Sequence, residues 1–215
     1  LTDGKDYLLL PEAKDYKRIG EHDTGLNTGG MGAVSPVPFA DNTFMKRVKE
    51  RIIAPTIKGI QQEKLDYKGF LFFGLMNVNG APYVIEYNCR MGDPEAEAII
   101  PRINQDLLEL LQHVSRGELQ NKSVEITPKT AASVMMVSGG YPGSYEKGFA
   151  LKGIKEIQHA LLFHAGTKIA KNKTVTNGGR VIAVTALAPD LPQALELAYA
   201  DARKIIFNKA YYRHD

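Results

Sequence analysis

GFLFFGLM (residues 69–76) and PYVIEYN (residues 82–88) are two mostly apolar segments on either side of an Asn79-Gly80 pair. Asn-Gly is the dipeptide that best suits the two-residue turn of a β-hairpin, because both turn positions need a positive φ. Short apolar segments bounded by turn residues are typical of buried strands. The sequence therefore predicts two central strands joined by a tight turn.

Helical periodicity is present in three other segments, namely residues 42–62, 104–116 and 191–207. Apolar residues recur there at a spacing of three to four positions, which places them on one face of a helix. In the first helix, Asn42 and Thr43 are candidate caps, and a proline predicts a kink or a break. In the second, the predicted buried side consists of Leu107, Leu108, Leu110 and Leu111.

Strands and helices alternate without a repeat, which predicts an α+β fold. Further strands are predicted at residues 131–137, 161–169, 174–176 and 180–187. Residues 12–35 are polar and rich in glycine, and we expect a long ordered loop or a lid there, without helix or strand. A polar segment, residues 117–129, is typical of a linker. We therefore expect one domain over residues 1–126 and a second over residues 127–215.

Composition excludes several classes of protein. The chain has 215 residues, with 27 basic and 24 acidic side chains and a net charge of +3. This charge is too small to indicate a nucleic-acid or membrane partner. Cys89 is the single cysteine, so no disulfide framework is present and a cytoplasmic location is expected. The chain begins at Leu1, and we interpret it as a piece of a longer protein.

The clearest candidate metal site is on the second hairpin strand. Residues two apart on a strand point to the same face, so Glu86 and Asn88 project together, and Arg90 continues the row if the strand persists. Mg²⁺ takes a few protein oxygens and completes its shell with water and phosphate, while an arginine can pair with phosphoryl oxygens. Cys89 is then expected to face the core. The alternative is a solvent-facing polar row on an edge strand.

The segment TGLNTGGMG (residues 24–32) is a candidate ligand-binding loop. Paired glycines let a ligand approach backbone amides, although no Gly-Lys-Ser/Thr follows as in a Walker loop. Two cations precede this loop and could hold a phosphate. The alternatives are a plain flexible loop and a solvated charge pair. The candidate substrate-binding residues are Lys17, Arg18, Thr24, Asn27, Gly29, Gly30 and Gly32.

Several motifs resemble those of the glycinamide ribonucleotide synthetase family, also called phosphoribosylamine–glycine ligases. They include DYKR (15–18), DTGLNTGGMGAVSP (23–36) and EYNCRMGDPEAE (86–97). GGYPG (139–143), FHAGT (163–167) and TNGGRV (176–181) resemble the C-terminal domain of that family. Tyr16, Leu26 and Met91 depart from its usual residues.

The resemblance implies the C-terminal portion of an ATP-grasp domain, followed by a small α+β domain. It implies ligation of glycine to 5-phosphoribosylamine at the expense of ATP, through a glycyl phosphate. Glu86 and Asn88 match ligands of Mg²⁺ or Mn²⁺, and Arg90 matches a catalytic arginine near the transferred phosphoryl group. The loop at residues 24–32 and the Asp93-Pro94-Glu95 turn are implied to form the substrate pocket.

The resemblance also implies a missing N-terminal half, including most of the ATP site, so that this chain is expected to be inactive alone. Two alternatives stay open. One is another ATP-grasp carboxylate–amine ligase, in which a carboxylate and an amide also hold the metal. The other is a metal- or phosphate-binding module without catalytic activity.

Overall fold

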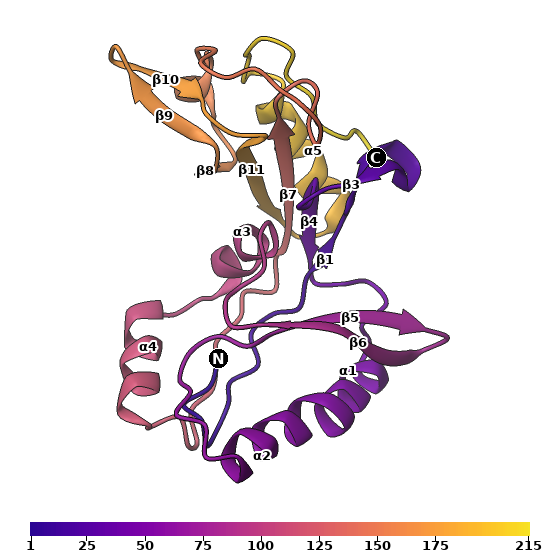
Figure 1. Ribbon diagram of the computed structural model, residues 1–215, viewed down its shortest axis with the longest axis vertical. Coiled ribbons are helices and arrows are strands. Elements are labelled where there is room, and N and C mark those ends of the chain that lie inside the picture. Colours follow the sequence, from indigo (N-terminus) through magenta and orange to yellow (C-terminus); the bar gives the residue numbers. More distant parts are fainter. The chain divides into compact units, whose positions relative to one another are not determined.

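The computed structural model describes residues 1–215 and is an α+β protein (Figure 1). The chain forms two compact units, each assembled from separate stretches. The first unit comprises residues 1–12, 36–92 and 103–127, and the second comprises residues 13–35, 93–102 and 128–215. One crossing between them, after Thr127, falls in the predicted linker, and the division into two sequence domains stays a prediction. No helix has the length and apolar character that crossing a bilayer requires.

The predicted helix over residues 42–62 is present as three consecutive helical segments. These are α1 (Asn42–Val48), a π-helical segment (Lys49–Ile53) and α2 (Ala54–Gln62). The wider π turn lies directly before Pro55, which has no N–H to donate to the preceding turn. The predicted caps were wrong, because the Asp41 carboxylate accepts the Phe44 N–H at 2.7 Å and caps the helix.

The predicted hairpin is confirmed as β5 (Phe72–Val78) and β6 (Ala81–Asn88). Asn79 and Gly80 have φ values of 52° and 79°, as the tight turn demands. The expectation that these strands are central was wrong, since they form a sheet of two strands. Tyr83, Ile85 and Tyr87 of β6 are exposed, because no third strand or helix covers them.

Helix α4 (Leu107–Arg116) confirms the second predicted helix, with Asp106 as its cap and Gly117 at its end in the left-handed region. Leu110 and Val114 are buried with Leu1, Leu8 and Leu119. The prediction for Leu108 was wrong, because that side chain is 63% exposed. It lies one position off the i, i+3, i+4 stripe that faces the core.

The second unit is built on an antiparallel sheet of five strands in the order β1-β4-β7-β11-β8. The strands β7 and β11 lie at its centre and are buried along nearly their whole length, which explains their continuous apolar sequences. The strands of the sheet are β1 (Lys14–Asp15), β4 (Gly32–Ser35), β7 (Thr130–Val137), β8 (Leu161–His164) and β11 (Arg180–Ala188).

The prediction that residues 12–35 lack strands was wrong. They contain β1, β4 and a small hairpin, β2 (Arg18–Gly20) and β3 (Thr24–Asn27), joined by a 3-10 turn (Glu21–Asp23). The four residues of β4 are small and fully buried between β1 and β7, so its sequence carries no alternating apolar signal. These residues form a strand because they pair with β7, which lies about a hundred residues later in the chain.

The predicted strand 161–169 is two strands, β8 and β9 (Thr167–Ala170), separated at Ala165-Gly166. β8 pairs with β11, whereas β9 pairs with β10 (Lys173–Thr176), which the sequence did predict. The single-strand prediction was therefore wrong, because the chain changes sheets at this glycine. A 3-10 turn (Ile154–Glu156) precedes β8.

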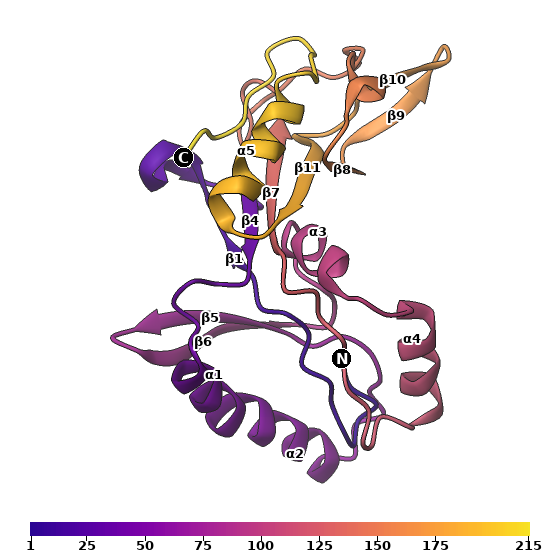
Figure 2. The ribbon, with the colours of Figure 1, turned by 180° about the vertical axis from the view of Figure 1, so that it is seen from behind.

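Two helices cover opposite faces of this sheet (Figure 2). Val34 and Ala132 pack with Ala194 of α5 (Leu191–Ala202). Their chain neighbours Ala33 and Ala131 point the other way, where they pack with Ala98 of α3 (Glu95–Ile99). A 3-10 turn (Ile100–Arg102) follows α3.

Helix α5 ends earlier than residue 207, where the sequence placed its end. The chain turns back after Ala202, and Ile206 forms a bridge with Lys152. Ile206 is 61% exposed, so its assignment to the buried face was wrong, whereas Ile205 is buried. At the other end of α5, the carboxylate of Asp190 caps the helix by accepting the Gln193 N–H at 2.9 Å.

Candidate functional site

The two candidate metal ligands lie on β6 of the first unit. Glu86 is opposite Gly74 and Asn88 is opposite Phe72, so the two side chains share a face. A Cβ at Gly74 would lie 2.8 Å from Cγ of Glu86, so glycine leaves the room that this carboxylate occupies. Glu86 is exposed, and Nδ2 of Asn88 is buried without a hydrogen-bond partner.

These two side chains fit a hard divalent cation that takes its other ligands from water and phosphate. The oxygens available to such a cation are those of the Glu86 carboxylate and the Asn88 side-chain carbonyl. No group of three or more His, Cys, Asp or Glu side chains gathers in the structure to hold a metal by itself.

The row of side chains does not continue to Arg90, because β6 ends at Asn88 and the chain bends. Nη1 of Arg90 donates to the Met91 carbonyl at 2.7 Å, and the side chain is exposed. Cys89 is exposed as well, so the prediction that it faces the core was wrong. Strand alternation no longer applies at Cys89, one residue past the end of the strand.

In the second unit, one arginine joins the glycine-rich loop to the Asp93-Pro94-Glu95 turn. Nη1 of Arg180, the first residue of β11, donates to the carbonyls of Gly29 at 3.0 Å and Asp93 at 2.8 Å. It also pairs with Oδ1 of Asp93 at 2.9 Å. The hydroxyl of Tyr141 accepts the Gly29 N–H at 2.9 Å. Two motifs far apart in sequence are therefore held as one local structure.

Gly30 lies at the centre of this structure, with φ of +123°, which side chains rarely adopt. A Cβ here would lie 2.8 Å from Oδ1 of Asp15 and would collide with the ring of Pro94. Glycine is therefore required both by the backbone conformation and by the close approach of Asp15 and Pro94.

Three largely buried carboxyl groups, Asp15 of β1 and Glu95 and Glu97 of α3, belong to this part of the second unit. The side chain of Asp15 is only 8% exposed, and Glu95 is 5% exposed. Burial raises the pKa of Asp15, and its ion pair with Lys17 opposes that rise. Burial and then the charge of Asp15 raise the pKa of Glu95, and burial likewise raises the pKa of Glu97. Burial therefore disfavours the charged form of each of these three carboxyl groups.

Not every predicted substrate-binding residue joins this structure. Arg18 donates to the Gly25 carbonyl at 2.7 Å and Thr24 to the Glu21 carbonyl at 2.8 Å, so both side chains serve their own hairpin. Asn27 is exposed opposite Arg18 on β3. Gly32 lies in β4, where a Cβ would come 2.6 Å from the Ser133 carbonyl oxygen. Those that gather around Arg180 and Asp15 are Lys17, Gly29, Gly30, Asp93, Pro94 and Glu95.

Sequence reasoning missed Asp15, Glu97, Tyr141 and Arg180. Asp15 lies two residues before Lys17 and Arg18, the cations that were interpreted as a phosphate site. Arg180 directly follows a Gly-Gly pair at the start of a predicted strand. Both positions lie in motifs that resemble the family, DYKR and TNGGRV, but neither motif assigned a role to the residue. Arg180 and Gly29 are 151 residues apart, so their contact is visible only in the fold.

Replacing Arg180 with alanine is expected to loosen the glycine-rich loop. Charge-assisted hydrogen bonds typically contribute about 1.5–3 kcal/mol each, so amide exchange in residues 24–31 should accelerate roughly 10- to 100-fold. Hydrogen exchange followed by mass spectrometry of the 215-residue chain measures this. Lys168→Ala, on the exposed strand β9, is the matched control. Equal exchange in R180A and wild type would show that Arg180 does not hold the loop.

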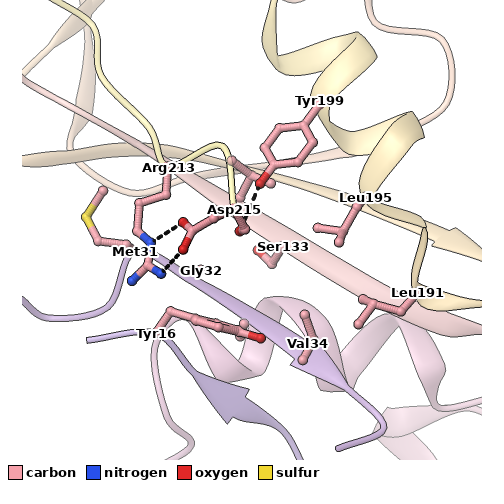
Figure 3. Close-up of a pocket in the computed structure, with 12 residues that line it drawn as sticks. Tyr16, Met31, Gly32, Val34, Ser133, Leu191, Leu195, Tyr199, Arg213 and Asp215 are labelled. Atoms are coloured by element: carbon pink, nitrogen blue, oxygen red, sulfur yellow. Dashed lines mark hydrogen bonds and ion pairs between the residues drawn. The ribbon is translucent and has the colours of Figure 1, made fainter. Parts of the chain in front are cut away.

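A separate pocket in the second unit lies between β4, β7 and α5 (Figure 3). Its wall is mostly apolar, and its polar end is closed by Arg213. The guanidinium of Arg213 donates to both carboxylate oxygens of Asp215, at 2.8 and 2.7 Å, and to Asp23 at 2.8 Å. These hydrogen bonds hold the pKa of Asp215 well below its usual range. Because its charges satisfy one another, this pocket offers no unpaired group to a ligand.

Comparison with protein families gives two matches along the chain. Residues 1–96 match the phosphoribosylglycinamide synthetase ATP-grasp (A) domain, and residues 131–215 match the C domain of the same synthetase. Curated proteins named phosphoribosylamine–glycine ligase from Caldanaerobacter subterraneus and Chlorobaculum tepidum are 41% and 44% identical to this chain over its whole length. The chain spans 51% of each, about half their length.

Solved structures agree with this match. A crystal structure of phosphoribosylamine–glycine ligase from Thermotoga maritima superposes with a TM-score of 0.89 at 35% identity, over 99% of this chain and 52% of that one. N5-carboxyaminoimidazole ribonucleotide synthetase from the same organism gives a TM-score of 0.54 at 20% identity, over 82% of this chain and 45% of that one. The second likeness is one of fold alone.

Proposed function

Since the chain belongs to the phosphoribosylglycinamide synthetase family, we propose that it is part of an ATP-dependent ligase of purine biosynthesis. The proposed reaction joins glycine to 5-phosphoribosylamine and releases glycinamide ribonucleotide, ADP and phosphate, through a glycyl phosphate. The observation that carries the proposal is the set of hydrogen bonds from Arg180 to the carbonyls of Gly29 and Asp93. These bonds hold together the glycine-rich loop and the Asp93-Pro94-Glu95 turn, two motifs typical of this family. The activity is proposed for a protein that includes an N-terminal half, acting in the cytoplasm.

In this proposal Glu86 and Asn88 hold Mg²⁺ or Mn²⁺. A cation held there would supply positive charge to neutralise the phosphates of ATP. The shared face of Glu86 and Asn88 supports the assignment. Arg90 is the proposed catalytic residue that pairs with the transferred phosphoryl group. Its side chain is exposed and bound only to the Met91 carbonyl, a contact that a phosphate could replace.

We assign substrate binding to the loop and turn of the second unit. Gly29, Gly30, Asp93, Pro94 and Glu95 are held there in one place, which supports a pre-formed pocket. Lys17 and Arg18 supply cations for the phosphate of phosphoribosylamine. Thr24, Asn27 and Gly32 stay assigned to the pocket by their motif. In domain terms, residues 1–126 are the C-terminal portion of the ATP-grasp domain and residues 127–215 its companion α+β domain.

Phosphate release tests this proposal. A protein that includes the N-terminal half is expected to release phosphate from ATP only when glycine and phosphoribosylamine are both present. The 215-residue chain alone is expected to release none and to show no micromolar affinity for ATP in calorimetry. Release that does not need glycine would favour another ATP-grasp ligase. An intact, metal-binding protein without any release would favour the non-catalytic module.

A further inference from the structure

Gly74 interrupts the strand β5, in which every other residue from Phe72 to Val78 carries a larger side chain. A glycine inside a strand costs stability, because it loses more backbone freedom on folding and has no side chain to pack. It is required where φ is positive or where another group comes very close to the backbone. The φ of Gly74 is not positive, so its backbone conformation does not require glycine.

The group that comes close to Gly74 is the side chain of Glu86. The three nearest atoms to a Cβ at this position all belong to Glu86, with Cγ at 2.8 Å, Oε1 at 3.5 Å and Cδ at 3.6 Å. Real Cβ atoms essentially never show contacts under 3.0 Å. The position of Cγ is set by χ1 alone, so Cγ can move away only if the side chain adopts another rotamer. Glu86 therefore has its present rotamer because residue 74 has no side chain.

A β-bulge lies directly beside this contact. Gly74 is opposite Glu86 but Leu75 is opposite Val84, so Ile85 is an extra residue in β6. Bulges bend a strand and change the direction of neighbouring side chains, and they are frequent next to active sites. The other candidate ligand lacks these features, since Asn88 is opposite the large side chain of Phe72. The glycine and the bulge thus occur together at Glu86.

We propose that Gly74 is a positioning residue for the metal ligand Glu86. By leaving out a side chain, it sets the rotamer in which the carboxylate can act together with Asn88. The inference rests on the proposed function, in which these two residues hold the cation. Mg²⁺ requires near-ideal geometry with oxygens at about 2.0–2.1 Å, so a change of rotamer in one ligand weakens the site. Alanine at position 74 therefore impairs metal binding although both ligands remain.

Mn²⁺ binding by the protein with its N-terminal half tests the proposal without turnover. Electron paramagnetic resonance in the presence of ADP measures the affinity, and Gly74→Ala is expected to weaken it roughly 10- to 100-fold, as for other residues that orient metal ligands. Gly59→Ala is the matched control, because a Cβ there meets no atom within 4 Å. It should bind Mn²⁺ as the wild type does.

The outcomes of this titration separate the inference from the proposed function. Equal Mn²⁺ affinity in G74A and the wild type overturns the inference and leaves the ligase function intact. No binding by the wild type would remove the metal role of Glu86, and the inference with it.

Phosphate release with the Mg²⁺ concentration varied gives a second readout. In G74A the concentration for half-maximal release is expected to rise roughly 10- to 100-fold, with KM for glycine changed by less than about threefold. G59A should change neither. A rise in KM for glycine as large as the change in Mg²⁺ dependence would show a general disturbance of the site and would overturn the assignment to Glu86.

The melting temperature distinguishes positioning from a structural role of Gly74. Glu86 is exposed and can adopt another rotamer at little cost, while alanine loses less backbone freedom than glycine on folding. G74A should therefore melt within about 3 °C of the wild type. A variant that fails to fold, or that melts far below the wild type, would show that the backbone of β5 needs the glycine, and would overturn the proposal.

Discussion

Replacing Glu86 with alanine in the protein that includes the N-terminal half is expected to abolish glycine-dependent phosphate release. A metal ligand stabilises charge on the transferred phosphoryl group by several kcal/mol, so kcat/KM should fall at least about 10³-fold. Glu86→Gln keeps the shape next to Gly74 but removes the charge, and a loss of similar size is expected. Phosphate release at saturating ATP, with the concentration of Mg²⁺ or Mn²⁺ varied, measures the effect.

The control for Glu86 is Glu63→Ala, an exposed carboxylate at the end of α2 in the same unit. It should leave turnover, metal dependence and melting temperature unchanged. E86A should also weaken Mn²⁺ binding, which electron paramagnetic resonance detects without any turnover. Unchanged release by E86A would remove the metal role from β6 and would favour the reading of this strand as a solvent-facing polar row.

The hairpin and its candidate ligands were predictable because their determinants are local. Asn79-Gly80 decides the turn, and the turn decides the register. With the strand direction known, Glu86 and Asn88 must share a face. The same argument failed at Cys89, one residue past the end of β6, because alternation holds only while the strand continues.

The second unit was less predictable because its determinants are distant in sequence. The strand β4 consists of small residues that become a strand only between β1 and β7. The glycine-rich loop is ordered by Arg180 and Tyr141, which follow it by more than a hundred residues. Motif resemblance located the loop and the turn separately. Only the fold shows that one guanidinium holds both, and that Asp15 lies against Gly30.

Replacing Asp201 with alanine is expected to cause the largest loss of stability in the second unit. The Asp201 side chain is fully buried at the end of α5. It accepts the backbone N–H groups of Gln158, His159 and Ala160 at 3.2, 2.7 and 2.8 Å, and Nζ of Lys204 at 2.7 Å. Alanine leaves three backbone donors unsatisfied, at about 1–3 kcal/mol for each donor, and removes the ion-pair partner of Lys204. We expect the free energy of unfolding to fall by about 3–5 kcal/mol.

Chemical denaturation of the 215-residue chain measures this loss, with Glu196→Ala on the exposed side of the same helix as the control. A change below about 1 kcal/mol in D201A would show that water replaces the carboxylate at little cost.

The dependence on pH separates the charge of Asp201 from its shape. Burial alone would raise the pKa of Asp201, but the hydrogen bonds from Lys204 and from three backbone N–H groups lower it from 3.8 to about 2. A lowered pKa means that the unfolded state binds the proton first, so the stabilisation is complete above about pH 4 and is lost as the pH falls towards 2. The melting temperature of the wild type should therefore fall more steeply than that of Asp201→Asn across this range. Parallel curves for the two proteins would place the stabilisation in the shape of the side chain and not in its charge.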